Sequence, residues 1–453
     1  MIFNQFSFVF VFLPVVLCLF YFYGSRRLRI PILILASFVF YGISGLVHLS
    51  VLVLDILVIY FLTYRNERIG KVALTFSILL PISFLIYFKY SSFLLSDVIG
   101  IIPAVDERSF SLFQDVLLPA GISFFTFQTI SYAIDRYRGE VQAPPFLDFV
   151  FYISFFPQLV AGPIVRFNQM GPQIRRISEF SPDANAILFG LTYFVAGLTY
   201  KVLIADSLGN LIDPMTARLA ELSALDAYFV LFSYSFQIYF DFYGYSLIAI
   251  GLGVWFGIRL PANFRRPYEA ASPKDFWRRW HVSLSYWIRD YLYLPLGGNE
   301  KYARNIVIIF LACGLWHGAG WNFVAWGAFH AALVLLAHRF EKQWGSLPLL
   351  MQRALTFLLV SFGWILFLFD FADAGLFLTR LVDFAGPGSE LNWLGWLVLA
   401  IAAFVCFRFH VEDWADKAHV IARLKLVGVC YGALLFICII MFDRSDSFIY
   451  FRF

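Results

Sequence analysis

Ionisable side chains inside apolar stretches are the residues of this chain best placed to do chemistry. His317 lies in Gly314–Trp321 (GLWHGAGW), within a long, almost wholly apolar segment. An ionisable residue at membrane depth is costly, so it usually faces a bundle interior or a cavity and marks a substrate or proton path. A structural alternative is that the imidazole only bonds a carbonyl freed by a glycine kink. His317 is therefore a candidate catalytic residue with a structural alternative.

The glycines around His317 predict a break in the membrane segment. Gly314, Gly318 and Gly320 weaken a regular helix and permit close approach of backbone or substrate. The stretch 305–338 is too long for one crossing of about 20 residues and short for two crossings with a turn. We therefore expect a broken span at His317.

Two further groups lie in the same half of the chain. Asp241 falls within the apolar run 227–256, on a stripe with Tyr234, Gln237 and Tyr245 at helical spacing. Such a stripe can hold helices together by hydrogen bonds or can take part in chemistry. His281 lies in a basic, aromatic segment, where an ordinary membrane-surface helix is the alternative to a functional role.

These groups suit an acyl transfer from a cytosolic donor into a membrane cavity. A neutral imidazole can take a proton from an attacking hydroxyl and return it to a leaving thiolate. Arginines could attract the phosphates of a thioester donor, although they also meet lipid headgroups; the candidates are Arg265, Arg278, Arg279 and Arg289. Cys313, one turn before His317, could carry the acyl group. A proton-coupled transporter is the rival class, although no inverted repeat is visible.

Composition predicts an all-α polytopic membrane protein. The 453 residues are 61% hydrophobic, 20% aromatic and 14% charged, and the net charge is +4. No soluble domain of this length has that balance, and nothing indicates nucleic-acid binding. The cysteines all lie in apolar runs without metal-ligand spacing, so neither a disulfide framework, a bound metal nor a bound cofactor is expected. Without a linker or repeat, 1–453 is predicted to be a single integral-membrane domain.

Hydropathy and basic loops predict the topology. We expect about eleven or twelve crossings, together with a re-entrant or in-plane element at 146–164, which prolines and glycine interrupt. Basic loops should be cytosolic, and the first contains Arg26, Arg27 and Arg29. The loop 91–115 is acidic and is placed outside. The first apolar run, 6–23, lacks signal-peptide features and is expected to be retained.

The basic loop 259–304 contains a predicted interfacial helix. Ser272 and Pro273 are typical of a helix start, with Asp275 near the positive helix end. The expected helix would lie in the membrane interface, with its aromatic face toward lipid; that face holds Trp277, Trp280, Leu284, Trp287 and Tyr291. His281 would lie at the edge of this face.

Several long motifs in the same order resemble the membrane-bound O-acyltransferase (MBOAT) family, most closely its bacterial alginate O-acetyltransferase branch. The resemblance spans nearly the whole chain. The matching stretches are 118–139 (LPAGISFFTFQTISYAIDRYRG), 161–166 (AGPIVR), 275–285 (DFWRRWHVSLS), 289–293 (RDYLY), 296–299 (LGGN), 314–319 (GLWHGA) and 448–451 (FIYF).

The resemblance implies membrane helices around a central funnel, with the catalytic histidine at His317 and a second functional histidine at His281. Asp241, Trp316 and Asn322 are expected to support the site. The resemblance also implies acetyl-CoA as the cytosolic donor and passage of the acetyl group across the bacterial inner membrane. A periplasmic SGNH-type acetyltransferase would then acetylate an exopolysaccharide such as alginate.

One stretch departs from the alginate pattern. The chain reads FDFYGYSL over 240–247, where alginate-type members have a second acid at the last position. Leu247 resembles instead the branch that transfers D-alanine to teichoic acid, so a D-alanyl carrier protein remains an alternative donor. Peptidoglycan O-acetylation is a further alternative, and the LGGN stretch and the carboxyl terminus favour acetylation.

Overall fold

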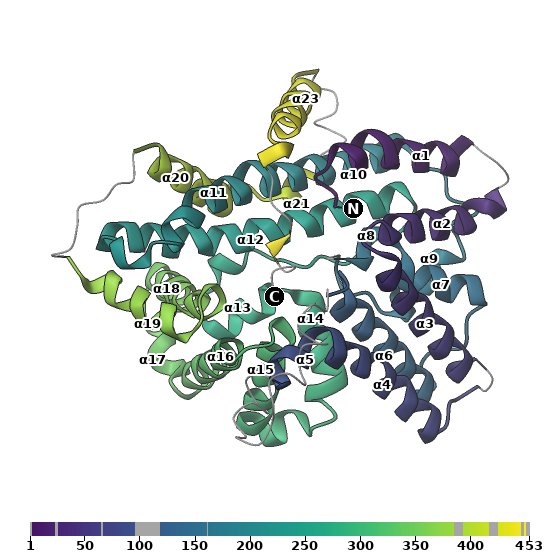
Figure 1. The fold of residues 1–453 in the computed structure, drawn as a ribbon, viewed down its shortest axis with the longest axis horizontal. Coiled ribbons are helices and arrows are strands. Elements are labelled where there is room, and N and C mark those ends of the chain that lie inside the picture. Colours follow the sequence, from purple (N-terminus) through teal and green to yellow (C-terminus); the bar gives the residue numbers. More distant parts are fainter. Residues whose placement is uncertain are drawn as a thin grey trace. The chain divides into compact units, whose positions relative to one another are not determined.

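The computed structural model describes residues 2–22, 26–64, 67–95, 118–160, 162–384, 393–415, 425–444 and 448–449. Within these ranges the regular structure is helical, without β-strands (Figure 1). Among the described residues, six helices are long and apolar enough to cross a membrane: Leu46–Thr63, Lys71–Phe93, Ala184–Thr216, Ala224–Trp255, Trp321–Arg339 and Leu349–Leu368. Shorter apolar helices cover Ser7–Phe22, Trp393–Arg408 and Gly428–Ile440. The all-α polytopic class is confirmed; the acidic loop predicted at 91–115 lies mostly outside the described residues.

The chain divides into two compact units. Unit 1 comprises 1–190 and 249–261, and unit 2 comprises 191–248 and 262–453. The helix α12 (Ala224–Trp255) is continuous and contributes residues to each unit. Every side chain proposed above for chemistry belongs to unit 2.

Unit 1 contains α1 (Leu13–Phe22), α2 (Arg29–Gly42), α3 (Leu46–Thr63), α4 (Lys71–Leu85) and α6 (Ile122–Arg138). The helix α6 is buried, and its polar residues Thr126, Gln128 and Ser131 face the protein interior. The interrupted segment forms α7 (Phe146–Ser154) and α8 (Phe156–Leu159). Both are too short to cross a bilayer, in agreement with a re-entrant or in-plane element.

Unit 2 holds the long helix formed by α10 (Ala184–Leu198) from Leu191 on, the π-helical turn η6 (Thr199–Ala205) and α11 (Asp206–Thr216). Its other helices near the site are α13 (Pro273–Arg279), α14 (Val282–Ile288), α15 (Tyr302–His317), α16 (Trp321–Arg339) and α18 (Leu349–Leu368). The predicted break at His317 is present, because α15 ends there and α16 begins at Trp321. The two helices form a tight hairpin (Figure 1).

The prediction of a single interfacial helix after Ser272 is wrong. The cap is as expected, since Ser272 Oγ accepts a hydrogen bond from Asp275 N at 3.1 Å. The helix then stops at Trp280, and His281 adopts a left-handed conformation (φ 44°) that separates α13 from α14. Trp280 is only 1% exposed and its ring lies 5.0 Å from that of Trp364. Part of the aromatic face predicted to meet lipid therefore packs against the protein.

Candidate active site

His317 is the last residue of α15, and the close packing of α15 on α16 fixes its place. A Cβ atom at Gly314 would lie 2.2 Å from the carbonyl oxygen of Phe323, and one at Gly327 would lie 2.3 Å from that of Phe310. Only glycine permits this approach of the two backbones. Gly318 then takes an extended conformation and ends the helix. The glycines predicted to allow close approach do so within this hairpin.

The His317 imidazole sits in a box of aromatic rings. The side chain is 3% exposed. Its ring centroid lies 4.8 Å from Trp316, 5.0 Å from Trp326 and 5.2 Å from Phe367, each in an edge-to-face arrangement. Such contacts hold a ring in one orientation. We name this group, His317 with Trp316, Trp326 and Phe367, the histidine box.

His281 is held by a hydrogen-bond network centred on Asn263. His281 Nδ1 lies 3.0 Å from Asn263 Oδ1, which also accepts the Ser283 hydroxyl at 2.8 Å. Asn263 Nδ2 donates to Ser246 Oγ at 3.3 Å, which orients the amide. Because the amide is oriented with Oδ1 toward His281, and an amide oxygen can only accept, Nδ1 of His281 is the donor. The lone pair of the neutral ring is then on Nε2. Burial lowers the pKa of His281, which lies outside the candidate spans, to about 3, so the ring is neutral at physiological pH.

The two predicted histidines meet around Trp316. The Trp316 ring lies 5.9 Å from that of His281 and 4.8 Å from that of His317. His281 is also in a strained backbone conformation, and it and Arg266 are the only non-glycine residues with positive φ in the described ranges. Strain of this kind persists only where the surroundings enforce it, often at functional sites. The pairing of the two histidines through one indole is the central feature of the site.

Asp241 lies in a buried ionic cluster. Its Oδ1 lies 2.6 Å from Lys201 Nζ, and Lys201 also contacts Asp206 Oδ1 at 2.5 Å. Asp241 Oδ2 accepts the backbone N–H of Ile449 at 2.8 Å. Lys201 is only 1% exposed. Asp241 therefore joins helices and anchors Ile449 near the carboxyl terminus. The ring centroid of its neighbour Phe242 lies 4.7 Å from that of His281.

Asn322 supports the box from outside. Its side-chain amide donates to the carbonyl oxygens of Leu366 at 3.1 Å and Phe369 at 3.4 Å. These carbonyls belong to the end of α18, which the amide caps. Phe367, one wall of the histidine box, lies between them in the chain. The structure thus places Asn322 as a cap at the end of α18.

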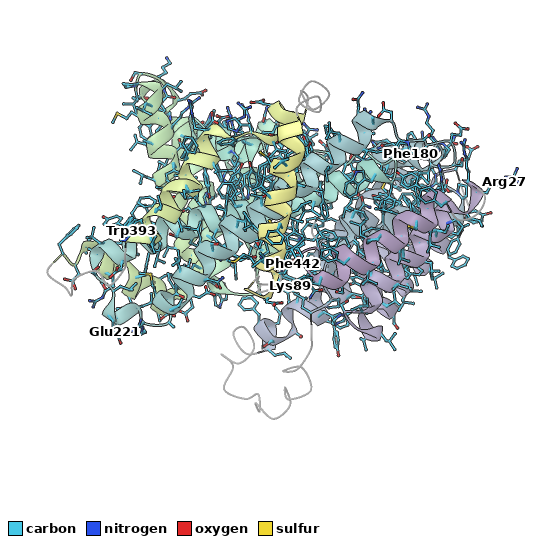
Figure 2. The ribbon with its side chains drawn as sticks, turned by 90° about the horizontal axis from the view of Figure 1, so that it is seen from above. Arg27, Lys89, Phe180, Glu221, Trp393 and Phe442 are labelled. Carbon is cyan, nitrogen blue, oxygen red and sulfur yellow. The ribbon has the colours of Figure 1, made fainter. Side chains whose placement is uncertain are left out.

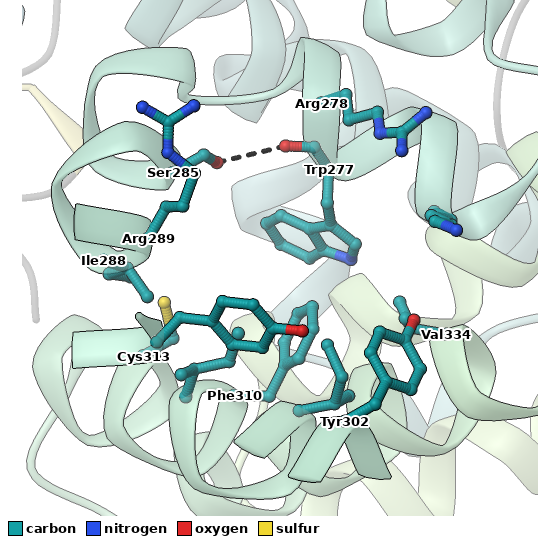
Figure 3. Close-up of a pocket in the computed structure, with 13 residues that line it drawn as sticks. Trp277, Arg278, Ser285, Ile288, Arg289, Tyr302, Phe310, Cys313 and Val334 are labelled. Atoms are coloured by element: carbon teal, nitrogen blue, oxygen red, sulfur yellow. Dashed lines mark hydrogen bonds between the residues drawn. The ribbon is translucent and has the colours of Figure 1, made fainter. Parts of the chain in front are cut away.

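A pocket of about 220 Å³ lies beside the histidine box (Figure 3). Trp277, Arg278, Ser285 and Arg289 from α13, α14 and the following turn face Phe310, Cys313 and Tyr302 of α15 (Figure 3). The complete lining also includes Lys274, Ile288, Tyr293, Ile306, Ile309 and Val334. The Trp277 ring lies 5.5 Å from that of Trp326 in the box. The pocket therefore combines a cationic, an aromatic and a thiol side.

Of the four arginines predicted to bind the donor, two line this pocket, and Arg265 is not one of them. Arg278 and Arg289 do so, and Arg289 also pairs with Asp290 at 2.6 Å. Arg279 is not among the lining residues and instead pairs with Asp275 at 2.9 Å. Lys274 supplies a further cation that the sequence interpretation did not single out. Cys313, one turn before His317, also lines the pocket.

Sequence reasoning missed three residues of this site. Lys201 could have been found, because a lysine inside an apolar span is rare and is usually paired. Asn263 is a loop residue whose sequence neighbours give no sign of its contact with His281. His330 is fully buried, and its ring lies 4.8 Å from Trp326 and 4.9 Å from Trp277. It thereby extends the aromatic packing between the histidine box and the pocket.

A helical bundle with two buried histidines beside a cationic pocket is the arrangement expected of an integral-membrane acyltransferase. No group of three or more His, Cys, Asp or Glu side chains in the described part of the chain is placed to hold a metal ion. The family model described as "MBOAT, membrane-bound O-acyltransferase family" matches residues 33–371. The chain therefore belongs to the MBOAT family of multi-pass membrane enzymes and is an O-acyltransferase.

Three relatives to which the chain is similar are named for different acyl-transfer reactions. The chain is 35% identical over 410 residues to "Peptidoglycan O-acetyltransferase" of Helicobacter pylori, covering 81% of this chain and 77% of the relative. It is 38% identical over 386 residues to "Probable alginate O-acetylase AlgI" of Pseudomonas aeruginosa, covering 81% and 72%. It is 28% identical over 268 residues to "Teichoic acid D-alanyltransferase" of Bacillus subtilis, covering 54% and 68%.

Proposed function

We propose that this protein takes acetyl from cytosolic acetyl-CoA and passes it across the bacterial inner membrane for O-acetylation of an extracytoplasmic polysaccharide such as alginate. The pocket beside the histidine box carries the proposal. Lys274, Arg278 and Arg289 provide cationic groups suited to the phosphates of a thioester donor. The aromatic and apolar walls suit the pantetheine arm. Two relatives named as acetylases support acetyl as the group transferred.

The proposed chemistry is a direct acyl transfer. His317 takes the proton from the attacking hydroxyl, whose oxygen forms a bond to the acetyl carbonyl carbon. The carbon–sulfur bond then breaks, and the imidazolium returns the proton to the leaving thiolate. His281, neutral and with its lone pair on Nε2, would orient the donor or accept a hydrogen bond near the reaction centre. Asp241, Trp316 and Asn322 would hold this geometry without taking part in bond changes.

The acceptor hydroxyl would belong to a periplasmic SGNH-type acetyltransferase, which then acetylates the polymer. Peptidoglycan is the alternative final acceptor, supported by the Helicobacter pylori relative. D-alanyl transfer is the alternative reaction. It is supported by Leu247, which is fully buried in α12 where the alginate branch has an acid, and by the similarity to a teichoic acid D-alanyltransferase.

The test is transfer of label from radiolabelled acetyl-CoA in inside-out vesicles that contain the partner protein. Wild type should release CoA and transfer label without a pH gradient, and His317→Gln should reduce transfer by about 100-fold or more, the scale of general acid–base catalysis. His48→Gln is the matched control, because that histidine is also buried but belongs to unit 1 and does not line the pocket. Equal transfer by His317→Gln and wild type would refute the mechanism. No transfer by wild type would favour a D-alanyl carrier.

A further inference from the structure

A second cavity, of about 720 Å³, lies in unit 1, whereas His281 and His317 belong to unit 2. It is formed where α1, the start of α2, the segment before α10 and the end of α12 come together. The lining residues are Leu17, Phe20, Tyr21, Phe22, Arg26, Arg29, Ser181, Pro182, Ile187 and Trp255. Arg27 and Phe180, the second of which accepts a hydrogen bond from Arg29, are labelled on the same side of the view in Figure 2. Nothing in the proposed acyl transfer uses this cavity.

The cavity carries positive charge that no carboxylate balances. Arg26 and Arg29 are its only charged lining residues, and in the described ranges neither forms a salt bridge. Arg29 is 7% exposed and is fixed by neutral groups. Its Nη1 donates to the carbonyl oxygen of Ile177 at 3.0 Å and to that of Phe180. Its guanidinium lies 4.8 Å from the centre of the Phe20 ring. Such a fixed, uncompensated guanidinium attracts an anion.

The two cations lie close enough to affect each other. Burial and, next, the charge of Arg26 lower the pKa of Arg29, which stands at the first residue of α2 outside the candidate spans. Keeping two like charges together without a counterion is unfavourable. An anionic group bound between them would remove that cost. Phosphate is the anion that guanidinium groups bind with bidentate hydrogen bonds.

The rest of the cavity is suited to hydrocarbon. Leu17, Phe20, Phe22 and Ile187 form apolar walls, and Tyr21 and Trp255 are aromatic residues with polar tips. Such residues gather at the level of lipid headgroups. Beyond the cavity, α1 exposes Val15 and Leu19. A ligand with a phosphate at one end and acyl chains at the other matches a cationic site that continues into apolar walls and the exposed apolar face of α1.

We propose that this cavity binds an anionic phospholipid of the cytoplasmic leaflet, with its phosphate on Arg26 and Arg29 and its acyl chains along α1. The basic loop that contains these residues is the one predicted to face the cytosol, and basic pockets on that side favour anionic lipid. The bound lipid would tie the start of α2 to the segment 177–182 and to the end of α12. Its role is to stabilise unit 1, and it does not depend on the acyl donor.

The experiment measures thermal unfolding and lipid retention of the purified full-length protein. Dioleoylphosphatidylglycerol should raise the unfolding midpoint and remain bound in native mass spectrometry, whereas dioleoylphosphatidylcholine should do neither. Arg26→Gln should lose most of the phosphatidylglycerol effect. Arg27→Gln is the matched control, since it removes the same charge from the adjacent residue, which does not line the cavity.

A second variant tests the apolar side without a change of charge. Ile187→Trp fills the wall of the cavity and should also reduce retention of phosphatidylglycerol. Equal stabilisation by the two lipids, or an undiminished phosphatidylglycerol effect in both Arg26→Gln and Ile187→Trp, would overturn the proposal. So would an Arg26-dependent stabilisation by CoA or inorganic phosphate that phosphatidylglycerol does not reproduce, because the cavity would then hold a soluble phosphate ligand.

Discussion

At the scale of single residues, the site contains two candidate acyl acceptors with different surroundings. Cys313 lines the cationic pocket, whereas His317 is enclosed by aromatic rings one helical turn later. Covalent carriage on a thiol needs the thiolate, which a nearby general base usually supplies. No histidine in the described part of the chain lines the pocket beside Cys313. Direct attack of the acceptor hydroxyl on the acyl donor, with His317 as the general base, is therefore the simpler route.

The variant Cys313→Ala separates these routes. It removes one sulfur atom from the pocket wall and leaves the histidine box intact, so we expect transfer within about a factor of three of wild type, well below the scale of a lost catalytic group. The measurement is the initial rate of label transfer in the vesicle assay. Loss of transfer in Cys313→Ala together with wild-type donor binding would establish acyl carriage on the thiol instead.

His281 should make the folded protein sensitive to acid. Its pKa is lowered by burial to about 3 in the folded state, below the value of about 6.5 in an unfolded chain. The unfolded state therefore binds the proton first as pH falls, and the stability contributed by the neutral ring is present above pH about 6.5 and lost progressively below it.

The check is the unfolding midpoint of the detergent-solubilised protein between pH 7.5 and pH 5. His281→Gln cannot protonate, and its amide can still meet Asn263 Oδ1. We therefore expect the midpoint to fall less with acid in His281→Gln than in wild type. An identical fall in both proteins would show that His281 does not titrate differently in the two states.

At the scale of elements, the buried cluster of Lys201, Asp206 and Asp241 joins η6, α11 and α12. Lys201→Met should destabilise strongly, by about 3–5 kcal/mol, because it removes the ammonium group that both buried carboxylates contact. Adding Asp206→Asn and Asp241→Asn removes the stranded charges, so the triple variant should be more stable than the single one. Unfolding midpoints of the two variants test this order, and a triple variant less stable than Lys201→Met would contradict it.

The α15–α16 hairpin depends on contacts that only glycine permits. Gly314→Ala would place a methyl group 2.2 Å from the Phe323 carbonyl oxygen, so the helices must separate and His317 must move. We expect loss of most transfer activity. Gly375→Ala, where no atom lies within 4 Å of the added carbon, is the control and should behave as wild type. Full activity in Gly314→Ala would mean that the site tolerates a looser hairpin.

The sequence predicted these elements unevenly, for physical reasons. The break at His317 follows from the placement of glycines in the sequence, which is a local signal. The separation of α13 from α14 was missed because His281 is held in its left-handed conformation by Asn263, a tertiary contact. The partner of Asp241 and the anchoring of Ile449 are likewise long-range contacts, which spacing along one helix does not reveal.

At the scale of the whole molecule, composition alone was enough to predict a polytopic membrane protein, because 61% hydrophobic residues leave few alternatives. The two compact units were not foreseen. Their division does not follow a linker, since unit 1 takes its last segment from the end of α12. A boundary that runs through a continuous helix leaves no composition shift in the sequence.

The length of α12 has a consequence for the membrane around the protein. Its 32 residues extend about 48 Å at 1.5 Å per residue, whereas the hydrocarbon layer is about 30 Å thick. The helix must therefore tilt strongly or extend beyond that layer, and a thicker bilayer relieves the mismatch. Because α12 also carries Asp241 and Phe242, bilayer thickness should influence the geometry beside His281. Transfer rates in vesicles of increasing acyl-chain length would reveal this dependence, and a flat profile would exclude it.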